Sequence, residues 1–227
     1  MSRRMAEEAI ALDPQYSDAY ALLGITHQMD VWLKTTESPE LSIRAAMDFA
    51  RKAIVLNYTN AVALASLGFL YTMSGQHEKG IVEAEKAVAF DPNSAMAHQF
   101  LGIALRFGGR PNDAIPVIKK VIRLDPFAPR TYIFNLGLSY LWAGQYEEAI
   151  KYCKKATDRE PNNLGAHLAL LVSYSMSGRN EDARTVAEEV LRIAPKFSVD
   201  FFSKTLTYKN QTDKETFISA LRKAGLK

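Results

Sequence analysis

A short signature that ends in proline recurs along this 227-residue chain at a nearly constant interval. A small aliphatic residue stands five positions before each of four prolines, in the pairs Ala87 and Pro92, Val121 and Pro126, Ala156 and Pro161, and Val190 and Pro195. The prolines are 34, 35 and 34 residues apart. This period is typical of stacked helical repeats, because a two-helix unit cannot bury its apolar face alone and packs it against the next unit.

Each repeat has the apolar spacing of two amphipathic helices with a glycine between them. The four glycines are Gly75, Gly109, Gly144 and Gly178. A tight reversal places the residue after the first helix at positive φ, where glycine is favoured. Five positions further on comes a small residue, namely Gly80, Ala114, Ala149 or Ala183. Proline then ends the second helix. The pattern predicts an all-α fold of antiparallel helix pairs.

The segment from Arg130 to Asn163 resembles the tetratricopeptide repeat. It carries that family's motif positions in order, as Leu136, Gly137, Tyr140, Gly144, Tyr146, Ala149, Ala156 and Pro161. The resemblance implies a right-handed superhelical solenoid whose first helices line a concave groove. It also implies a protein or peptide as the partner, and no catalysis.

The repeat pattern divides the chain into a solenoid over 1–196 and a helical cap over 197–227. We assign the solenoid as the second helix of a truncated repeat (1–14), a repeat with a ten-residue insertion (15–58), and repeats at 59–92, 93–126, 127–161 and 162–195. The insertion lies around Asp30 to Leu41, and Ser38 before Pro39 indicates a helix start there. Because the chain begins in mid-repeat, we expect it to be part of a longer protein.

The segment after Pro195 has no repeat period. We expect one short helix, a polar turn at Lys209 to Gln211, and a last helix from Asp213 that Gly225 closes. Thr212 and Glu215 have the spacing of a capping box.

Composition and charge exclude several classes of function. A formal charge of +3 is too small to indicate a polyanionic partner, so we expect no nucleic acid. A lone cysteine, Cys153, excludes an internal disulfide and favours a reducing compartment, so we expect a cytoplasmic protein. The sequence has no apolar run of the roughly 18 residues that a membrane span needs.

The residues that carry chemistry in other proteins are scattered here. His27, His77, His98 and His167 lie in different repeats without a second ligand at helical spacing, so we interpret them as ordinary surface or groove residues and expect no metal. Cys153 stands where neighbouring repeats have core residues. We therefore predict no catalytic residues, no cofactor and no enzyme activity.

The resemblance places fourteen residues of the first helices in the groove: Phe69, Met73, Met96, Gln99, Ile103, Arg106, Phe107, Phe134, Asn135, Leu138, Trp142, Leu168, Val172 and Met176. Methionine and aromatic side chains suit adaptable peptide binding. Only Asn135 matches the residues with which some repeats of this family hold a terminal carboxylate. We therefore expect an apolar or amphipathic ligand, anchored by Phe107 and Trp142, and little contribution from Lys119 and Lys120 on an outer helix.

Two alternatives stay open. The N-terminal edge and the insertion with Trp32 could pair with a second copy, which would make the chain a dimerisation module. The extended first repeat, the stretch from Gly108 to Pro126 and the C-terminal end also resemble the C-terminal repeat regions of bacterial class III adenylate/guanylate cyclase-like proteins. That resemblance implies a regulatory arm of a signalling enzyme.

Overall fold

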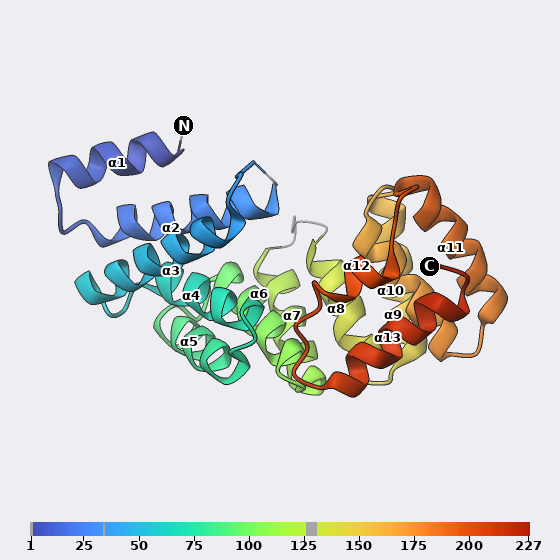
Figure 1. The fold of residues 1–227 in the computed structure, drawn as a ribbon. Coiled ribbons are helices and arrows are strands. Elements are labelled where there is room, and N and C mark those ends of the chain that lie inside the picture. Colours follow the sequence, from blue (N-terminus) through green and yellow to red (C-terminus); the bar gives the residue numbers. More distant parts are fainter. Residues whose placement is uncertain (1, 34, 126–130) are drawn as a thin grey trace. The chain divides into compact units, whose positions relative to one another are not determined.

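The computed structural model describes residues 2–33, 35–125 and 131–227, and the side chain of Trp32 lies outside the described set. All regular structure in these ranges is helical (Figure 1), which confirms the predicted fold class. The helices are α1 (Ser2–Leu12), α2 (Ser17–Trp32), α3 (Pro39–Leu56), α4 (Ala61–Met73), α5 (His77–Phe90), α6 (Ala95–Phe107), α7 (Pro111–Leu124), α8 (Thr131–Trp142), α9 (Tyr146–Arg159), α10 (Leu164–Met176), α11 (Asn180–Ile193), α12 (Val199–Ser203) and α13 (Gln211–Lys223).

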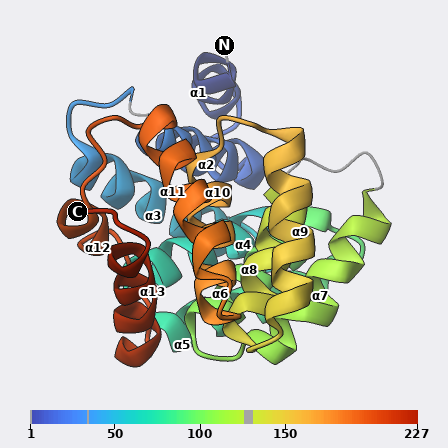
Figure 2. The same ribbon diagram turned by 90° about the vertical axis from the view of Figure 1, so that its right-hand side faces the viewer.

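The chain forms two compact units, Met1–Ala104 and Leu105–Lys227, which we call the N-terminal and C-terminal units. In the N-terminal unit α2 packs against α3, and α4 against α5. In the C-terminal unit α8 packs against α9, and α10 against α11, while α13 lies on α10 (Figure 2). Consecutive helices thus pack in pairs within each unit, and the boundary between the units falls inside α6, which belongs to the predicted repeat at 93–126.

The four predicted turn glycines all have positive φ, with values of 77°, 81°, 73° and 82° at Gly75, Gly109, Gly144 and Gly178. The residue after each glycine donates its backbone N–H to the carbonyl five positions earlier, as from Gln145 to Tyr140 at 2.9 Å. This bond satisfies one of the carbonyls that a helix end leaves free.

The small residues of each repeat allow the paired helices to approach closely. Ala114, Ala149 and Ala183 are at most 1% exposed. A Cβ atom on Gly137 would lie 2.7 Å from Sγ of Cys153, so a larger residue does not fit there. Cys153 itself is fully buried, and burial raises the pKa of its thiol to about 12. The interpretation of Cys153 as a core residue is confirmed.

The insertion in the first full repeat is built largely as longer helices. Helix α2 has 16 residues where α4 and α10 have 13, and α3 has 18 where α5 and α9 have 14. Helix α3 begins at Pro39 with Ser38 as N-cap, as predicted, but the Ser38 side chain makes no capping bond. The side chain of Thr36 accepts a hydrogen bond from the Ser38 N–H instead.

Two of the histidines have a structural role that the sequence did not suggest. The ring Nε2 atoms of His98 and His167 lie 2.9 Å and 3.0 Å from the carbonyl oxygens of Pro92 and Pro161, six residues earlier in each case. A carbonyl only accepts, so Nε2 carries the proton. Both side chains are buried, as is that of His77, so the expectation of ordinary surface or groove residues is wrong for these three. His98 and His167 fasten the turns at Pro92 and Pro161 to the helices that follow.

The cap contains the expected short helix and last helix, α12 and α13. Helix α13 begins at Gln211, earlier than predicted, with Asn210 as N-cap; the side chain of Asn210 accepts a hydrogen bond from the Thr212 N–H. The predicted capping box at Thr212 and Glu215 is therefore wrong, because asparagine is among the preferred N-cap residues and stands first in the chain. The backbone N–H of Val199 donates to the Lys227 carbonyl at 2.7 Å, which ties the two helices together.

Candidate protein-interaction site

The first helices of the C-terminal unit form a face that the chain itself covers. We call the surface of α8, α10 and the end of α6 the inner face, and residues 199–227 the closing segment. Tyr208 of this segment stacks on Phe107, with ring centroids 4.6 Å apart, and meets Trp142 edge-on at 4.9 Å. Phe217 of α13 packs against the other part of Trp142, at 5.8 Å. The closing segment thus fills the inner face with aromatic side chains.

The Tyr208 hydroxyl is the polar centre of this contact. It accepts hydrogen bonds from the guanidinium of Arg106 at 3.2 Å and from the indole N–H of Trp142 at 2.9 Å. The backbone N–H of Lys209 donates to the Phe107 carbonyl at 3.1 Å. These three hydrogen bonds are made by two consecutive residues of the closing segment, Tyr208 and Lys209. They therefore fix the position of the segment along the inner face.

Arg106 is an unusual residue in this arrangement. It is only 4% exposed, its guanidinium lies 4.5 Å above the Phe107 ring, and its Nε atom has no partner among the described residues. Burial lowers the pKa of Arg106 and raises that of Tyr208. A guanidinium buried with a neutral hydroxyl as its hydrogen-bond partner is costly, since no carboxylate offsets the loss of water.

The structure separates the predicted groove residues into several groups. In the N-terminal unit Phe69 and Ile103 are buried, and Met73, Met96 and Gln99 are half-buried. In the C-terminal unit Arg106, Phe107 and Trp142 are brought together under Tyr208. The remaining residues are Phe134 and Met176, which are half-buried, and Asn135, Leu138, Leu168 and Val172, which are buried.

Two of these predictions need correction. Leu168 and Val172 are 1% and 0% exposed, so they belong to the core and do not face a ligand. The reason is that α10 is packed by α8, α9, α11 and α13 together, which leaves little of it open. Phe107 and Trp142 contact Tyr208 and Phe217 of the closing segment, so these two aromatic residues stand where a peptide ligand was expected.

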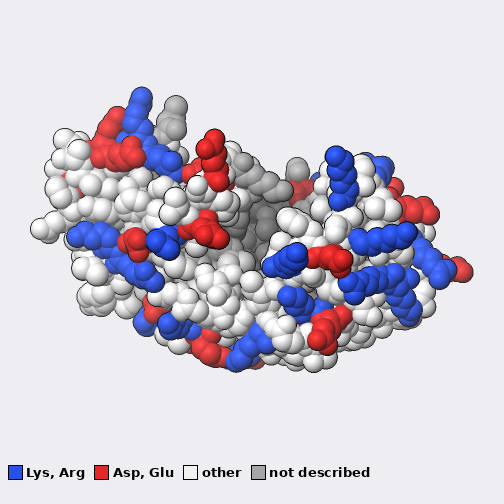
Figure 3. All heavy atoms as spheres, in the orientation of Figure 1, with Lys and Arg blue, Asp and Glu red and all other residues white. Residues whose placement is uncertain are grey.

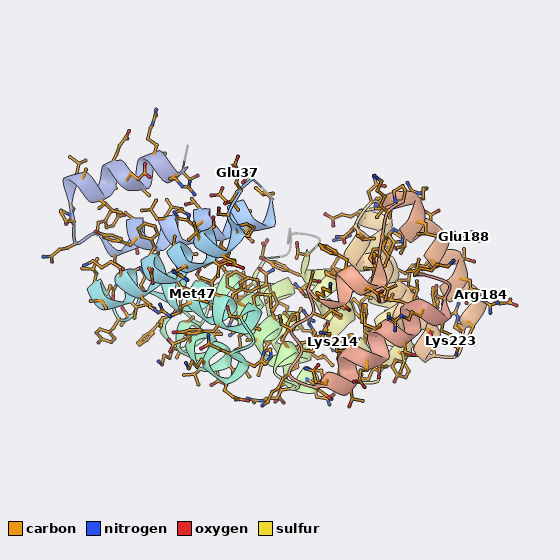
Figure 4. All side chains as sticks on the ribbon, in the orientation of Figure 1. Glu37, Met47, Arg184, Glu188, Lys214 and Lys223 are labelled. Atoms are coloured by element: carbon orange, nitrogen blue, oxygen red, sulfur yellow. The ribbon has the colours of Figure 1, made fainter. Side chains whose placement is uncertain are left out.

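The aromatic residues of the closing segment are the part of the site that repeat analysis missed. Tyr208 and Phe217 lie outside the repeat period, so no register assigned them a position. Helix α13 buries Phe217 and Leu221 and leaves Lys223 exposed, an amphipathic pattern (Figure 4, where Lys214 and Lys223 are labelled). That pattern was the available signal that the last helix packs against another surface.

The described residues offer no site for a metal ion, since no three His, Cys, Asp or Glu side chains among them are suitably grouped. No helix in the described ranges is sufficiently long and apolar to cross a membrane. Basic and acidic side chains both occur on each unit in the face that Figure 3 draws.

Comparison with known protein families gives a match in the C-terminal unit. Residues 140–199 match the model of the tetratricopeptide repeat family, which is 60 of the 227 residues. No curated protein matches the chain as a relative. The match and the solved structures below give no support to the narrower resemblance to cyclase-like proteins.

Several solved structures resemble this chain in fold. PilW, described as a widely conserved type IV pilus biogenesis factor, is 18% identical with a TM-score of 0.69, over 92% of this chain and 90% of PilW. YrrB, described as a repeat protein with an unusual peptide-binding site, is 19% identical with a TM-score of 0.58, over 88% and 98%. A repeat protein from Parabacteroides merdae is 17% identical with a TM-score of 0.62, over 98% and 84%. At these identities the likeness establishes the fold.

Proposed function

We propose that this protein is a non-catalytic scaffold that binds an apolar or amphipathic peptide segment on the inner face of its repeats. The tetratricopeptide fold is one of protein-interaction scaffolds, and a peptide-binding site is described for YrrB. The observation that carries the proposal is the closing segment itself. It is a segment without repeat character, and it seats two aromatic side chains on Phe107 and Trp142.

The contacts of the closing segment define what a competing ligand needs. It needs an aromatic ring for the stack with Phe107 and an acceptor for the N–H groups of Arg106 and Trp142. A carboxylate in the place of the Tyr208 hydroxyl would add an ion pair with Arg106, whose guanidinium donates to that hydroxyl and has an unpartnered Nε among the described residues. We therefore propose an amphipathic ligand with an aromatic residue and an acidic residue close together.

A competing ligand must displace a segment that is tethered to the same chain. A short tether gives an effective concentration in the millimolar range, so a free peptide with the same contacts binds the intact protein weakly. The test uses a synthetic peptide of residues 199–227 and calorimetry on the full-length protein. We expect at least about tenfold tighter binding to Tyr208→Ala than to the unchanged protein, because this substitution weakens the internal competitor.

Tyr58→Ala, which changes an exposed tyrosine of the N-terminal unit, is the matched control and leaves peptide binding unchanged. Adding Trp142→Ala to Tyr208→Ala removes the gain. Equal binding to the unchanged protein and to Tyr208→Ala, or no binding to either, would contradict a peptide-binding inner face.

A natural partner recovered by pull-down provides a second test. Phe107→Ala and Trp142→Ala each weaken its binding by about 2 kcal/mol or more, as central aromatic anchors do. Lys120→Ala on the outer helix α7 changes the binding by less than about 0.5 kcal/mol. A larger effect of Lys120 than of the two aromatic residues would place that partner elsewhere.

Self-association is the second candidate function, and the exposure of apolar residues favours it. Met5 and Leu12 of α1 are 57% and 89% exposed, and Leu33 and Leu41 in the insertion are 65% and 63% exposed. The predicted contribution of Trp32 falls on a side chain outside the described residues. Light scattering at micromolar concentration distinguishes the two functions, because a monomer excludes a stable dimer. A regulatory arm of a signalling enzyme and a cytoplasmic location remain predictions from the sequence.

A further inference from the structure

The outer side of the C-terminal unit has a cleft between α7 and α9, with α8 as its floor. Its volume is about 630 Å³. Nine described residues line it: Pro116, Lys119, Ile122 and Arg123 from α7, Ile133 and Leu136 from α8, and Tyr152, Lys155 and Arg159 from α9. We call it the basic cleft. It has an apolar floor with two basic residues on each of its two walls, and no lining residue among those described is acidic.

The four cations of the basic cleft keep their positive charge for a ligand, and Lys119 lies over the Tyr140 ring, with Nζ 5.5 Å from the ring centroid. Lys119, Arg123, Lys155 and Arg159 are exposed, and none of them forms an ion pair with a carboxylate of the described residues. Other basic residues of the chain do pair along their helices. For example, Lys151 pairs with Glu148 on α9, at 3.2 Å.

The spacing of the cations limits which ligands are complementary to the basic cleft. Lys119 and Arg123 are four residues apart on α7, and Lys155 and Arg159 are four residues apart on α9. Four residues rise about 6 Å along a helix, so each wall presents a row of two charges with that spacing. Between the rows lie Ile122, Ile133 and Leu136. The cleft therefore presents an apolar strip with a line of positive charge on both sides.

An amphipathic helix with acidic flanks is complementary to this surface. Its apolar stripe faces the floor, and glutamates four residues apart on either side of the stripe repeat at the same 6 Å. The lining stretches 116–123 and 152–159 each rise about 10 Å, which corresponds to about two turns of such a helix. A small inorganic anion would form ion pairs with the cations but would make no apolar contact with the floor.

We propose that the basic cleft is a docking site for a short acidic amphipathic helix of another protein. The site lies between α7 and α9 and shares no residue with the contact of Phe107, Trp142 and Tyr208, so it is independent of the function proposed above. Charge complementarity selects and steers the partner, and its apolar stripe is held by contact with the accessible lining residues Pro116, Ile122 and Tyr152.

The test uses a synthetic helical peptide of about 15 residues, with leucines at i, i+3, i+4 and i+7 spacing and glutamates on both flanks. Its binding to the full-length protein is measured by calorimetry at low and at physiological salt. A scrambled peptide of the same composition tests whether binding needs the apolar stripe on one face of the helix. A peptide with serine in place of leucine tests whether binding needs apolar contact with the floor of the cleft. Inorganic pyrophosphate and vesicles of phosphatidylserine report on other anions.

The double variant Arg123→Gln with Lys155→Gln removes one charge from each wall. The matched control, Lys120→Gln with Lys154→Gln, removes the same charge from the same two helices outside the cleft. We expect at least about tenfold weaker peptide binding for the cleft variant and less than about twofold for the control. All four residues lie at the surface rather than in the core, so circular dichroism should show both variants folded.

Four results would overturn the proposal. They are no binding of the helical peptide, equal binding of the scrambled or serine peptide, equal loss in the two double variants, and tighter cleft-dependent binding of pyrophosphate or of vesicles. The last result would assign the cleft to a phosphate-bearing ligand instead.

Discussion

The inner and outer faces of the C-terminal unit are built by the same repeats but differ in their exposure to solvent. On the inner face Arg106 is 4% exposed and lies under Tyr208, in a contact made of aromatic rings. On the outer face Lys155 and Arg159 are exposed beside an open apolar floor. The difference arises from residues 199–227, which have no repeat character. The repeats thus define two possible faces, and a non-repeat segment decides which of them is open.

The largest expected effect is that of removing the residue that closes the inner face. Tyr208→Ala should lower the free energy of unfolding by about 3–5 kcal/mol, because it leaves a cavity beside Phe107 and Trp142 and a buried guanidinium without its acceptor. Denaturation in urea, followed by circular dichroism, measures this. The control Tyr58→Ala, at a residue 73% exposed, should cost at most about 1 kcal/mol. Similar costs for the two variants would mean that the inner face is not closed.

A smaller change isolates the polar part of the same contact. Tyr208→Phe keeps the ring but removes the oxygen that accepts from Arg106 and Trp142. We expect a loss of about 1–3 kcal/mol, since two buried donors are left without a partner. The midpoint of urea denaturation should lie between those of the unchanged protein and Tyr208→Ala. A neutral Tyr208→Phe would show that water already reaches Arg106.

The interior between the two faces can be tested at Ala149, where α9 meets α8. Ala149 is fully buried, so Ala149→Leu should overpack the contact and cost about 1–3 kcal/mol. Lys154→Leu places the same side chain at an exposed position of the same helix and should have little effect. An unchanged denaturation midpoint for Ala149→Leu would show that α9 has a different register.

The repeat period predicted the interior well and the faces poorly, for a physical reason. Buried alanines and the positive φ at Gly144 depend on contacts inside one repeat, which recur with the period and are visible in the sequence. The cover over Trp142 depends on Tyr208, 66 residues away in a segment with no period. The repeat period does not predict the basic cleft, because the position of its cations over an apolar floor depends on how α7 and α9 flank α8.

The pH dependence of the free energy of unfolding tests whether water reaches the buried thiol of Cys153. Its thiol pKa is raised to about 12 from 9.0 by burial, so the protonated form is favoured in the folded state. The contribution of this pKa shift to the free energy of unfolding is fully present below about pH 9 and is lost as the pH rises from there toward 12. Between pH 8 and 10 the unchanged protein should lose about 1 kcal/mol more than Cys153→Ala does. Parallel losses in the two proteins would mean that water reaches the thiol.

The smallest effect is expected at the open outer face. Lys155→Gln removes an exposed charge that has no ion-pair partner among the described residues and lies in a cleft with three other cations. Its effect on the free energy of unfolding should be within about 0.5 kcal/mol, and slightly stabilising at low salt, because repulsion between like charges is relieved. Urea denaturation at low and at physiological salt measures both the size and the sign. A loss above about 1 kcal/mol would mean that Lys155 has a structural contact, and the outer face would then be closed by its own residues as the inner face is. The Arg123→Gln, Lys155→Gln variant should instead keep its stability and lose peptide affinity. That result would show that these cations bind a ligand and do not stabilise the fold.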